Sequence, residues 1–272
     1  MRYSNNHSRL IINQSKILIG FVLVMLFVYC DVEKKISSDN PTTDDLKILF
    51  IGNSLTHWNN MVDMFQNFIN LSGKNALVVE FSPGGMHLDE HVVNTMTHSY
   101  IQDNDWDYVV IQGADYSIAF QDLRDNVLPP IKSLIDLIKS NSKNTKIIFY
   151  LDYSLRKGII RGDTHYSLNE FQSMINVGTK IVADDLHMKI APVGEAWRRV
   201  FNDGPPIDLY ALDQGHPSAI GSYVMACVYF STIYRESVTS LDYYGPLSEN
   251  AAWIIQTIAS ETVLGQLRYW NL

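Results

Sequence analysis

The segment that decides the fold reads KILFIGNSLT and covers residues 47–56. Residues 48–51 are apolar without a break, and Gly52 and Asn53 then supply turn residues before Ser54. A strand without polar alternation is typical of a parallel sheet that helices cover on both faces. The segment therefore predicts a buried strand followed by a turn that presents the serine hydroxyl beyond the sheet.

Four further segments have the same character, and longer stretches of helical periodicity separate them. The predicted strands are 47–52, 76–82, 107–113, 146–152 and 189–194. The predicted helices are 61–72, 88–98, 125–140, 167–186, 218–234 and 250–267. This alternation predicts an α/β fold, a three-layer α/β/α sandwich around a parallel sheet of about five strands that occupies residues 46–272. Such sheets bind ligands beyond the carboxyl ends of their strands, so the polar residues there are the functional candidates.

The composition excludes several classes of protein. The chain has 272 residues, of which 46% are hydrophobic, so it is neither disordered nor of low complexity. Residues 1–29 hold three of the 21 basic residues and none of the 29 acidic ones, so the rest of the chain is strongly acidic and is not expected to bind nucleic acid. Two cysteines, Cys30 and Cys227, exclude a disulfide-rich scaffold and a cysteine-rich zinc site.

The N-terminal residues 1–30 predict an export signal. Arg2, Arg9 and Lys16 precede an apolar run over residues 17–29. As a helix this run would be roughly 20 Å long, which is shorter than the bilayer core of about 30 Å. A basic segment followed by a short apolar one is typical of a signal peptide.

The run ends at Cys30 in the sequence LFVYC, which resembles the lipobox of bacterial lipoproteins, although Tyr29 stands where a small residue is usual. The resemblance implies a lipid anchor at Cys30, the only contact with a membrane that we expect. Residues 31–45 are polar and predict a flexible tether to the domain. We therefore expect an exported protein, either lipid-anchored in the periplasm or at the cell surface, or secreted. An uncleaved signal anchor is the alternative.

Polar residues of hydrolytic chemistry follow the predicted strands. Ser54 follows the first strand, a glycine pair ending at Gly85 follows the second, and Gln112 ends the third. Near the end of the chain Asp213 and His216 lie three residues apart on a loop, a spacing that lets a carboxylate bond one imidazole nitrogen. Each block alone is also ordinary turn or cap chemistry. Their combination favours a site.

Together these blocks resemble the SGNH hydrolases of the GDSL-like esterase/lipase superfamily. The resemblance rests on GNSLT at 52–56, the glycine pair 84–85 and DQGHPS at 213–218, in this order, and covers roughly residues 46–234. It implies a flavodoxin-like fold and ester hydrolysis without metal or cofactor. It further implies Ser54 as nucleophile, His216 as base, Asp213 as the partner of the imidazole, and the N–H groups of Ser54 and Gly85 as oxyanion donors.

The third block departs from the family pattern, which is usually Gly-x-Asn-Asp. Here residues 112–115 read QGAD, and no asparagine is present. The amide of Gln112 is a donor of the same kind, so we expect it to complete the oxyanion hole. Asp115 is closer to the missing asparagine by position, but a carboxylate would repel an oxyanion.

The expected substrate is a small or polysaccharide ester, with a carbohydrate O-acetyl group favoured for an exported esterase. Four aromatic residues flank the predicted strand ends and could stack on sugar rings or pack in the core: Trp58, Trp106, Tyr116 and Tyr153.

Two other interpretations remain open at this point. Residues 87–91 read HLDEH, the inverted zinc-peptidase pattern, in which His87 and His91 share one helix face and bind Zn²⁺ while Glu90 acts as base. The altered third block also allows a catalytically degenerate, carbohydrate-binding domain.

Overall fold

The computed structural model describes residues 45–113 and 116–272. The predicted export signal, Cys30, nearly all of the predicted tether and Asp115 lie outside these residues, so the anchor and the tether stay predictions. In the described part of the chain, none of the helices combines the length and the apolar character needed to cross a membrane.

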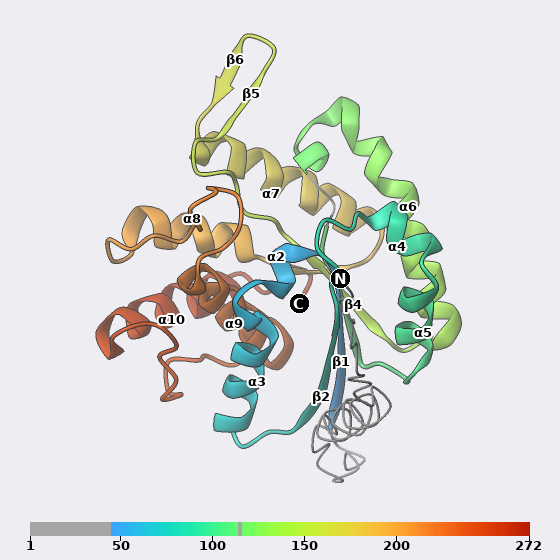
Figure 1. Ribbon diagram of the computed structural model, residues 1–272, viewed down its shortest axis with the longest axis horizontal. Helices are drawn as coiled ribbons and strands as arrows, with labels where there is room; N and C mark the ends of the chain where they lie inside the picture. Colours follow the sequence, from blue (N-terminus) through green and yellow to red (C-terminus); the bar gives the residue numbers. More distant parts are fainter. Residues whose placement is uncertain (1–44, 114–115) are drawn as a thin grey trace, which may run out of the picture. The chain divides into compact units, whose positions relative to one another are not determined.

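The core of the domain is a sheet of five parallel strands in the order β2-β1-β3-β4-β7 (Figure 1). The strands are β1 (Leu46–Ile51), β2 (Ala76–Phe81), β3 (Tyr108–Ile111), β4 (Lys146–Tyr150) and β7 (Lys189–Ala191). The predicted fold class is therefore confirmed. Because the chain runs from β1 to β2 on one side and then returns to β3 on the other, the strand order reverses between β1 and β3, which is where such sheets bind ligands.

Helices cover both faces of the sheet, as Figure 1 shows with the sheet seen nearly edge-on. One layer holds α3 (Met61–Leu71), α8 (Val193–Asp203), α9 (Ala219–Tyr234) and α10 (Glu249–Leu264). The other holds α4 (Leu88–Val93), α5 (Thr95–Gln102), α6 (Gln121–Asn141) and α7 (Leu168–Asp185). Successive residues of β1 point to opposite layers: Ile48 and Phe50 pack in the first, Leu49 and Ile51 in the second. This is why residues 48–51 of β1 are apolar without a break.

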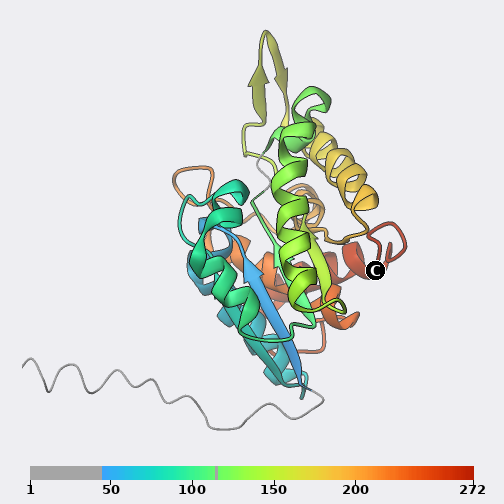
Figure 2. The ribbon, with the colours of Figure 1, turned by 90° about the vertical axis from the view of Figure 1, so that its right-hand side faces the viewer.

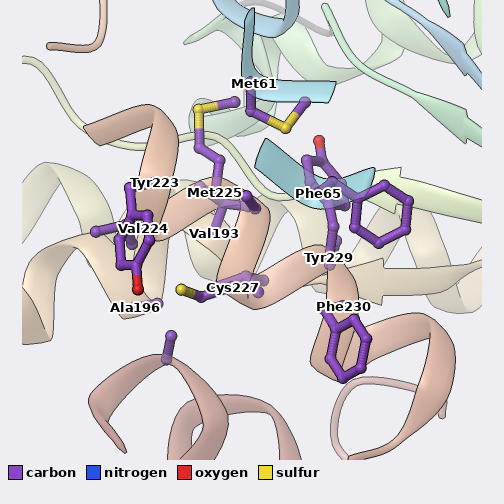
Figure 3. Packing of buried hydrophobic residues seen from close by; sticks show 14 of the residues in the cluster. Met61, Phe65, Val193, Ala196, Tyr223, Val224, Met225, Cys227, Tyr229 and Phe230 are labelled. Carbon is purple, nitrogen blue, oxygen red and sulfur yellow. The ribbon is translucent and has the colours of Figure 1, made fainter. Parts of the chain in front are cut away.

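Helix α9 is buried along most of its length and fixes the loop that precedes it. Its side chains pack among those of α3, α8 and α10, and Cys227 lies fully buried in this cluster (Figure 3). Ser218 caps the helix by accepting a hydrogen bond from the N–H of Gly221 at 3.2 Å. The residues just before Ser218 are therefore held against a rigid element.

A small antiparallel hairpin, which the sequence analysis did not predict, follows the carboxyl end of β4. Its strands are β5 (Ile159–Arg161) and β6 (Thr164–Tyr166), and they project beyond the main sheet (Figures 1 and 2). Arg161 fastens the hairpin to the start of α6 through a two-bond ion pair with Asp122 and lies over the ring of Phe120.

Candidate active site

The turn after β1 places Ser54 at the carboxyl edge of the sheet. Asn53 has extended backbone geometry, and its side-chain oxygen accepts a hydrogen bond from the N–H of Leu55 at 3.1 Å. The carbonyl of Asn53 accepts hydrogen bonds from the N–H groups of Thr56 and His57. Ser54 therefore begins a short helix, α2 (Ser54–His57), directly after its N-cap Asn53.

The structure brings together the three residues that the sequence pairs as nucleophile, base and carboxylate. The Oγ atom of Ser54 lies 2.9 Å from Nε2 of His216, and Nδ1 of the same ring lies 2.6 Å from Oδ2 of Asp213. A carboxylate only accepts hydrogen bonds, so Nδ1 donates to it. In the neutral ring Nε2 is then the acceptor, and the hydroxyl of Ser54 donates to it. The three side chains therefore form a continuous hydrogen-bonded chain, which is called the relay below.

Backbone hydrogen bonds hold Asp213 in place and keep it ionised. Its Oδ1 atom accepts from the N–H of Gly215 at 3.0 Å and from the N–H of His216 at 2.9 Å. These bonds, followed by the bond to the imidazole, lower the pKa of Asp213 to about 2. The carboxylate is therefore charged at any physiological pH. The site is open, since 32% of the His216 side chain and 45% of the Asp213 side chain are exposed.

The loop of His216 is also fixed at its backbone. The N–H of Ala211 donates to the carbonyl of His216 at 2.8 Å, and Tyr210 and Pro217 form an antiparallel bridge. The hydroxyl of Tyr153, itself buried, donates to the carbonyl of Gly215 at 2.9 Å. The loop is therefore anchored from within the core while its side chains reach solvent.

The second predicted oxyanion donor, Gly85, lies in an exposed turn after β2. Its φ of 75° is left-handed, a conformation that glycine adopts without strain. The Nδ2 atom of Asn53 donates to the carbonyl of Met86 at 3.2 Å, which joins the turn of Ser54 to the turn of Gly85. Within residues 45–113 and 116–272, the N–H groups of Ser54 and Gly85 have no hydrogen-bond acceptor.

Comparison with known proteins agrees with this architecture. A protein of the DUF4886 family from Bacteroides uniformis has a TM-score of 0.66 and 19% identity, over 81% of this chain and 95% of that one. A protein from Slackia heliotrinireducens, for which SGNH hydrolase activity has been suggested, has a TM-score of 0.56 and 26% identity, over 70% and 100%. The chain has an SGNH hydrolase-like fold.

A third similar structure is a variant of an acetyl-xylooligosaccharide esterase from Geobacillus stearmophilus. It has a TM-score of 0.52 and 16% identity, over 69% of this chain and 94% of that one. No protein-family model matches the chain, and no curated protein matches it either. The likeness to SGNH hydrolases is therefore one of fold.

Gln112 lies in the third block, where this chain departs from the SGNH pattern. Its side chain is 1% exposed, and Oε1 accepts from the N–H of Asn53 at 2.9 Å and the hydroxyl of Thr56 at 3.0 Å. A Cβ on Gly52 would lie 2.6 Å from the same oxygen, so only glycine fits there. Gln112 thus anchors the turn of Ser54. Its Nε2 atom is buried and has no partner among the described residues, and its role as an oxyanion donor stays a prediction.

The zinc interpretation of residues 87–91 does not hold for His91. Its ring is fully buried: Nε2 donates to the carbonyl of Gly52 at 2.8 Å, and Nδ1 accepts from the hydroxyl of Thr97 at 2.9 Å. Burial lowers the pKa of His91 below its usual 6.5. His87 is exposed and precedes α4, so the two rings do not share an open face. Across the described residues, no three His, Cys, Asp or Glu side chains are grouped to hold a metal ion. His91 instead supports the turn of Ser54.

The four aromatic residues considered for sugar stacking have different environments. Trp106 is buried at the amino end of β3, which is the wrong edge of the sheet, and Tyr153 is buried against Trp197. Tyr116 donates through its hydroxyl to the carbonyl of Tyr153 at 3.3 Å. Trp58 lies flat against the ring of His216. For Trp106 and Tyr153 the stacking interpretation is therefore wrong, because neither ring has a free face.

Proposed function

We propose that this protein is a serine esterase that works through an acyl-enzyme, and the relay of Ser54, His216 and Asp213 is the observation that carries the proposal. His216 accepts the hydroxyl proton through Nε2 while Oγ of Ser54 bonds to the acyl carbon of the ester. Asp213 keeps the proton on Nδ1 and stabilises the imidazolium. The imidazolium then protonates the leaving alcohol oxygen as the carbon–oxygen bond of the ester breaks.

Hydrolysis of the acyl-enzyme repeats these steps with water. His216 takes a proton from water as its oxygen attacks the acyl carbon, and then returns that proton to Oγ of Ser54 as the acid leaves. The oxyanion of each tetrahedral intermediate is met by the free N–H groups of Ser54 and Gly85, with Gln112 as the expected third donor. Preorganised donors of this kind each contribute about 10²–10³ in turnover.

The substrate class that we favour is an O-acetylated carbohydrate. The relay side chains are partly exposed, so a bulky hydrophilic alcohol can remain in solvent while its acetyl group reaches Ser54. A surface cavity beside Gly113 is lined with polar groups that suit sugar hydroxyls, among them His87, Glu90 and Asn126. The similar acetyl-xylooligosaccharide esterase and the predicted export signal support the same class.

The test is hydrolysis of p-nitrophenyl acetate and release of acetate from acetylated xylan by the full-length protein. Ser54→Ala should abolish both activities, because no other group in the relay can form the acyl-enzyme. Ser140→Ala is the control, since Ser140 is exposed and its hydroxyl donates only to the carbonyl of Leu137. Equal turnover by wild type and Ser54→Ala would reject the esterase. Binding of xylan without turnover by either protein would favour the degenerate carbohydrate-binding domain instead.

A further inference from the structure

The indole of Trp58 forms one wall of the relay. Its ring lies nearly parallel to the imidazole of His216, with an interplanar angle of 11° and ring centroids 4.1 Å apart. Trp58 begins a short 3₁₀ helix, η1 (Trp58–Asn60), which follows α2 directly. The nucleophile and the ring that covers the base are therefore four residues apart on one continuous piece of chain.

The backbone around Trp58 is shaped to hold this contact. Asn59 and Asn60 both have left-handed geometry, with φ of 58° and 54°, which asparagine tolerates better than most residues. Nδ2 of Asn59 donates to the carbonyl of Pro217 at 3.0 Å and to Oγ of Ser222 at 2.9 Å. The hydroxyl of Ser222 in turn donates to the carbonyl of Trp58 at 3.1 Å.

These bonds connect the segment after the nucleophile to the loop of the base. Pro217 follows His216 directly, and Ser222 is fully buried in α9. The carbonyl of Trp58 and the carbonyl of Pro217 are thus tied to one another through Asn59 and a rigid core helix. The segment of Trp58 and the loop of His216 are therefore held in a fixed relation to one another, which keeps the two stacked rings together.

His216 needs such support because its other two partners restrain it weakly. Ser54 must move during the reaction, and Asp213 is partly exposed, so water competes for its bond to the ring. A flat aromatic face restricts rotation of the imidazole out of the plane of the relay. The same face attracts the ring when it becomes positively charged in the transition state.

Resting on the proposed esterase function, we propose that Trp58 and Asn59 are positioning residues for His216. Trp58 confines the imidazole to the plane in which it reaches both Ser54 and Asp213, and Asn59 confines Trp58. Neither residue enters the covalent steps. Displacement of a reacting group by about 1 Å can cost 10²-fold in rate, so the effect of losing the stack falls on kcat.

The test compares Trp58→Ala, Trp58→Phe and Asn59→Gly in the full-length protein. Trp253→Ala is the control, because Trp253 is 55% exposed and lies on α10, away from the relay. Turnover of p-nitrophenyl acetate gives kcat and KM. The rate of labelling by a fluorophosphonate probe reports activation of Ser54 separately, since Oγ displaces fluoride while His216 takes its proton.

We expect Trp58→Ala to lower kcat and the labelling rate together by about 10- to 100-fold, with KM within about twofold of wild type. Trp58→Phe should restore most of the loss, because it keeps an aromatic face. Asn59→Gly keeps the left-handed backbone without the side chain and should lower kcat by about fivefold. If circular dichroism shows that Trp58→Ala does not fold, Trp58→Phe and Asn59→Gly provide the test.

Two results would overturn the positioning role. A rise in KM with unchanged kcat and labelling would make Trp58 a substrate contact, and equal kinetics for Trp58→Ala and Trp253→Ala would leave it without a role. Both results are interpreted on the condition that Ser54→Ala abolishes the activity of the wild-type protein. Full activity of Ser54→Ala would instead refute the proposed function itself, so the two failures are distinguishable.

Discussion

Replacing Asp213 by asparagine should reverse the tautomer of His216 while leaving the loop almost unchanged. The amide oxygen can still accept from the N–H groups of Gly215 and His216, as Oδ1 does now at 3.0 and 2.9 Å. The amide nitrogen then faces Nδ1, which must become an acceptor. The ring proton moves to Nε2, which donates toward Ser54 and can no longer act as a base.

The size of the effect follows from the alternative orientation of the new amide. Turning this amide around would restore the active tautomer but would set its NH₂ group against two backbone N–H groups. Each of the two lost hydrogen bonds is worth roughly a factor of five, so the active form should be populated about once in 25. Loss of the charge opposite the imidazolium adds to this. We expect kcat to fall by about 10²–10³, less than the roughly 10⁴ seen for a buried aspartate, because water screens this exposed group.

The assay is kcat/KM for p-nitrophenyl acetate at neutral pH, with Asp208→Asn as the matched control. Asp208 lies just upstream of the same loop, accepts from the N–H of Tyr210 at 3.1 Å and pairs with Arg156 outside the relay. The control substitution should change turnover by less than about twofold. A loss below about threefold for Asp213→Asn, or an equal loss in the control, would refute the tautomer argument.

Two further predictions concern the buried groups under Ser54. Gln112→Glu keeps the acceptor for Asn53 and Thr56 but removes the amide donor, so kcat should fall by about 10²–10³ if Nε2 meets the oxyanion. A loss of kcat under about fivefold, in a variant that unfolds in urea like wild type, would contradict the donor role. The folded state disfavours protonated His91, because burial lowers its pKa below 6.5. The contribution of neutral His91 to the free energy of unfolding is complete above pH 6.5 and is lost as pH falls through the lowered pKa. In urea unfolding, the free energy of unfolding of wild type should therefore fall by up to about 1.4 kcal/mol per pH unit relative to that of His91→Gln. A pH-independent difference would argue against this.

Strands β1, β3 and β4 were predictable because their residues are buried in the layers on both faces of the sheet, which leaves a continuous apolar run without helical periodicity. The prediction for 47–52 differs from β1 by one residue at each end. The prediction for 189–194 was too long, since β7 ends at Ala191. Pro192 lacks the N–H that a strand needs for its ladder, and α8 begins at Val193.

The predicted helix over 88–98 was wrong in its continuity, and a side chain explains why. Asn94 has extended geometry, and its oxygen accepts from the N–H groups of Met96 at 2.9 Å and Thr97 at 3.0 Å. It therefore ends α4 and caps α5. The periodicity of apolar residues does not reveal where a side chain competes with the helix backbone for hydrogen bonds, so it could not predict this break.

The relay residues could be selected from local motifs, whereas their supports could not. Trp58 offered only a ring near a strand end, and its contact with His216 depends on two left-handed asparagines and on a buried serine of α9. The spacing of His91 fits a metal-binding pattern, but its ring is buried and bonded to the carbonyl of Gly52, so it supports the turn of Ser54 instead. Tertiary contacts decided both cases.

The arrangement resolves a conflict between access and precision. The proposed polysaccharide substrate needs an open site, yet the proposed general-base catalysis needs groups held within a fraction of an ångström. Here the turn of Ser54 and the loop of His216 are each fixed by buried neighbours. Gln112 and His91 hold the turn of Ser54, while Tyr153 and Ser222 hold the loop of His216 from the opposite side. The core supplies the rigidity, and so the surface of the site stays open, as the proposed substrate class requires.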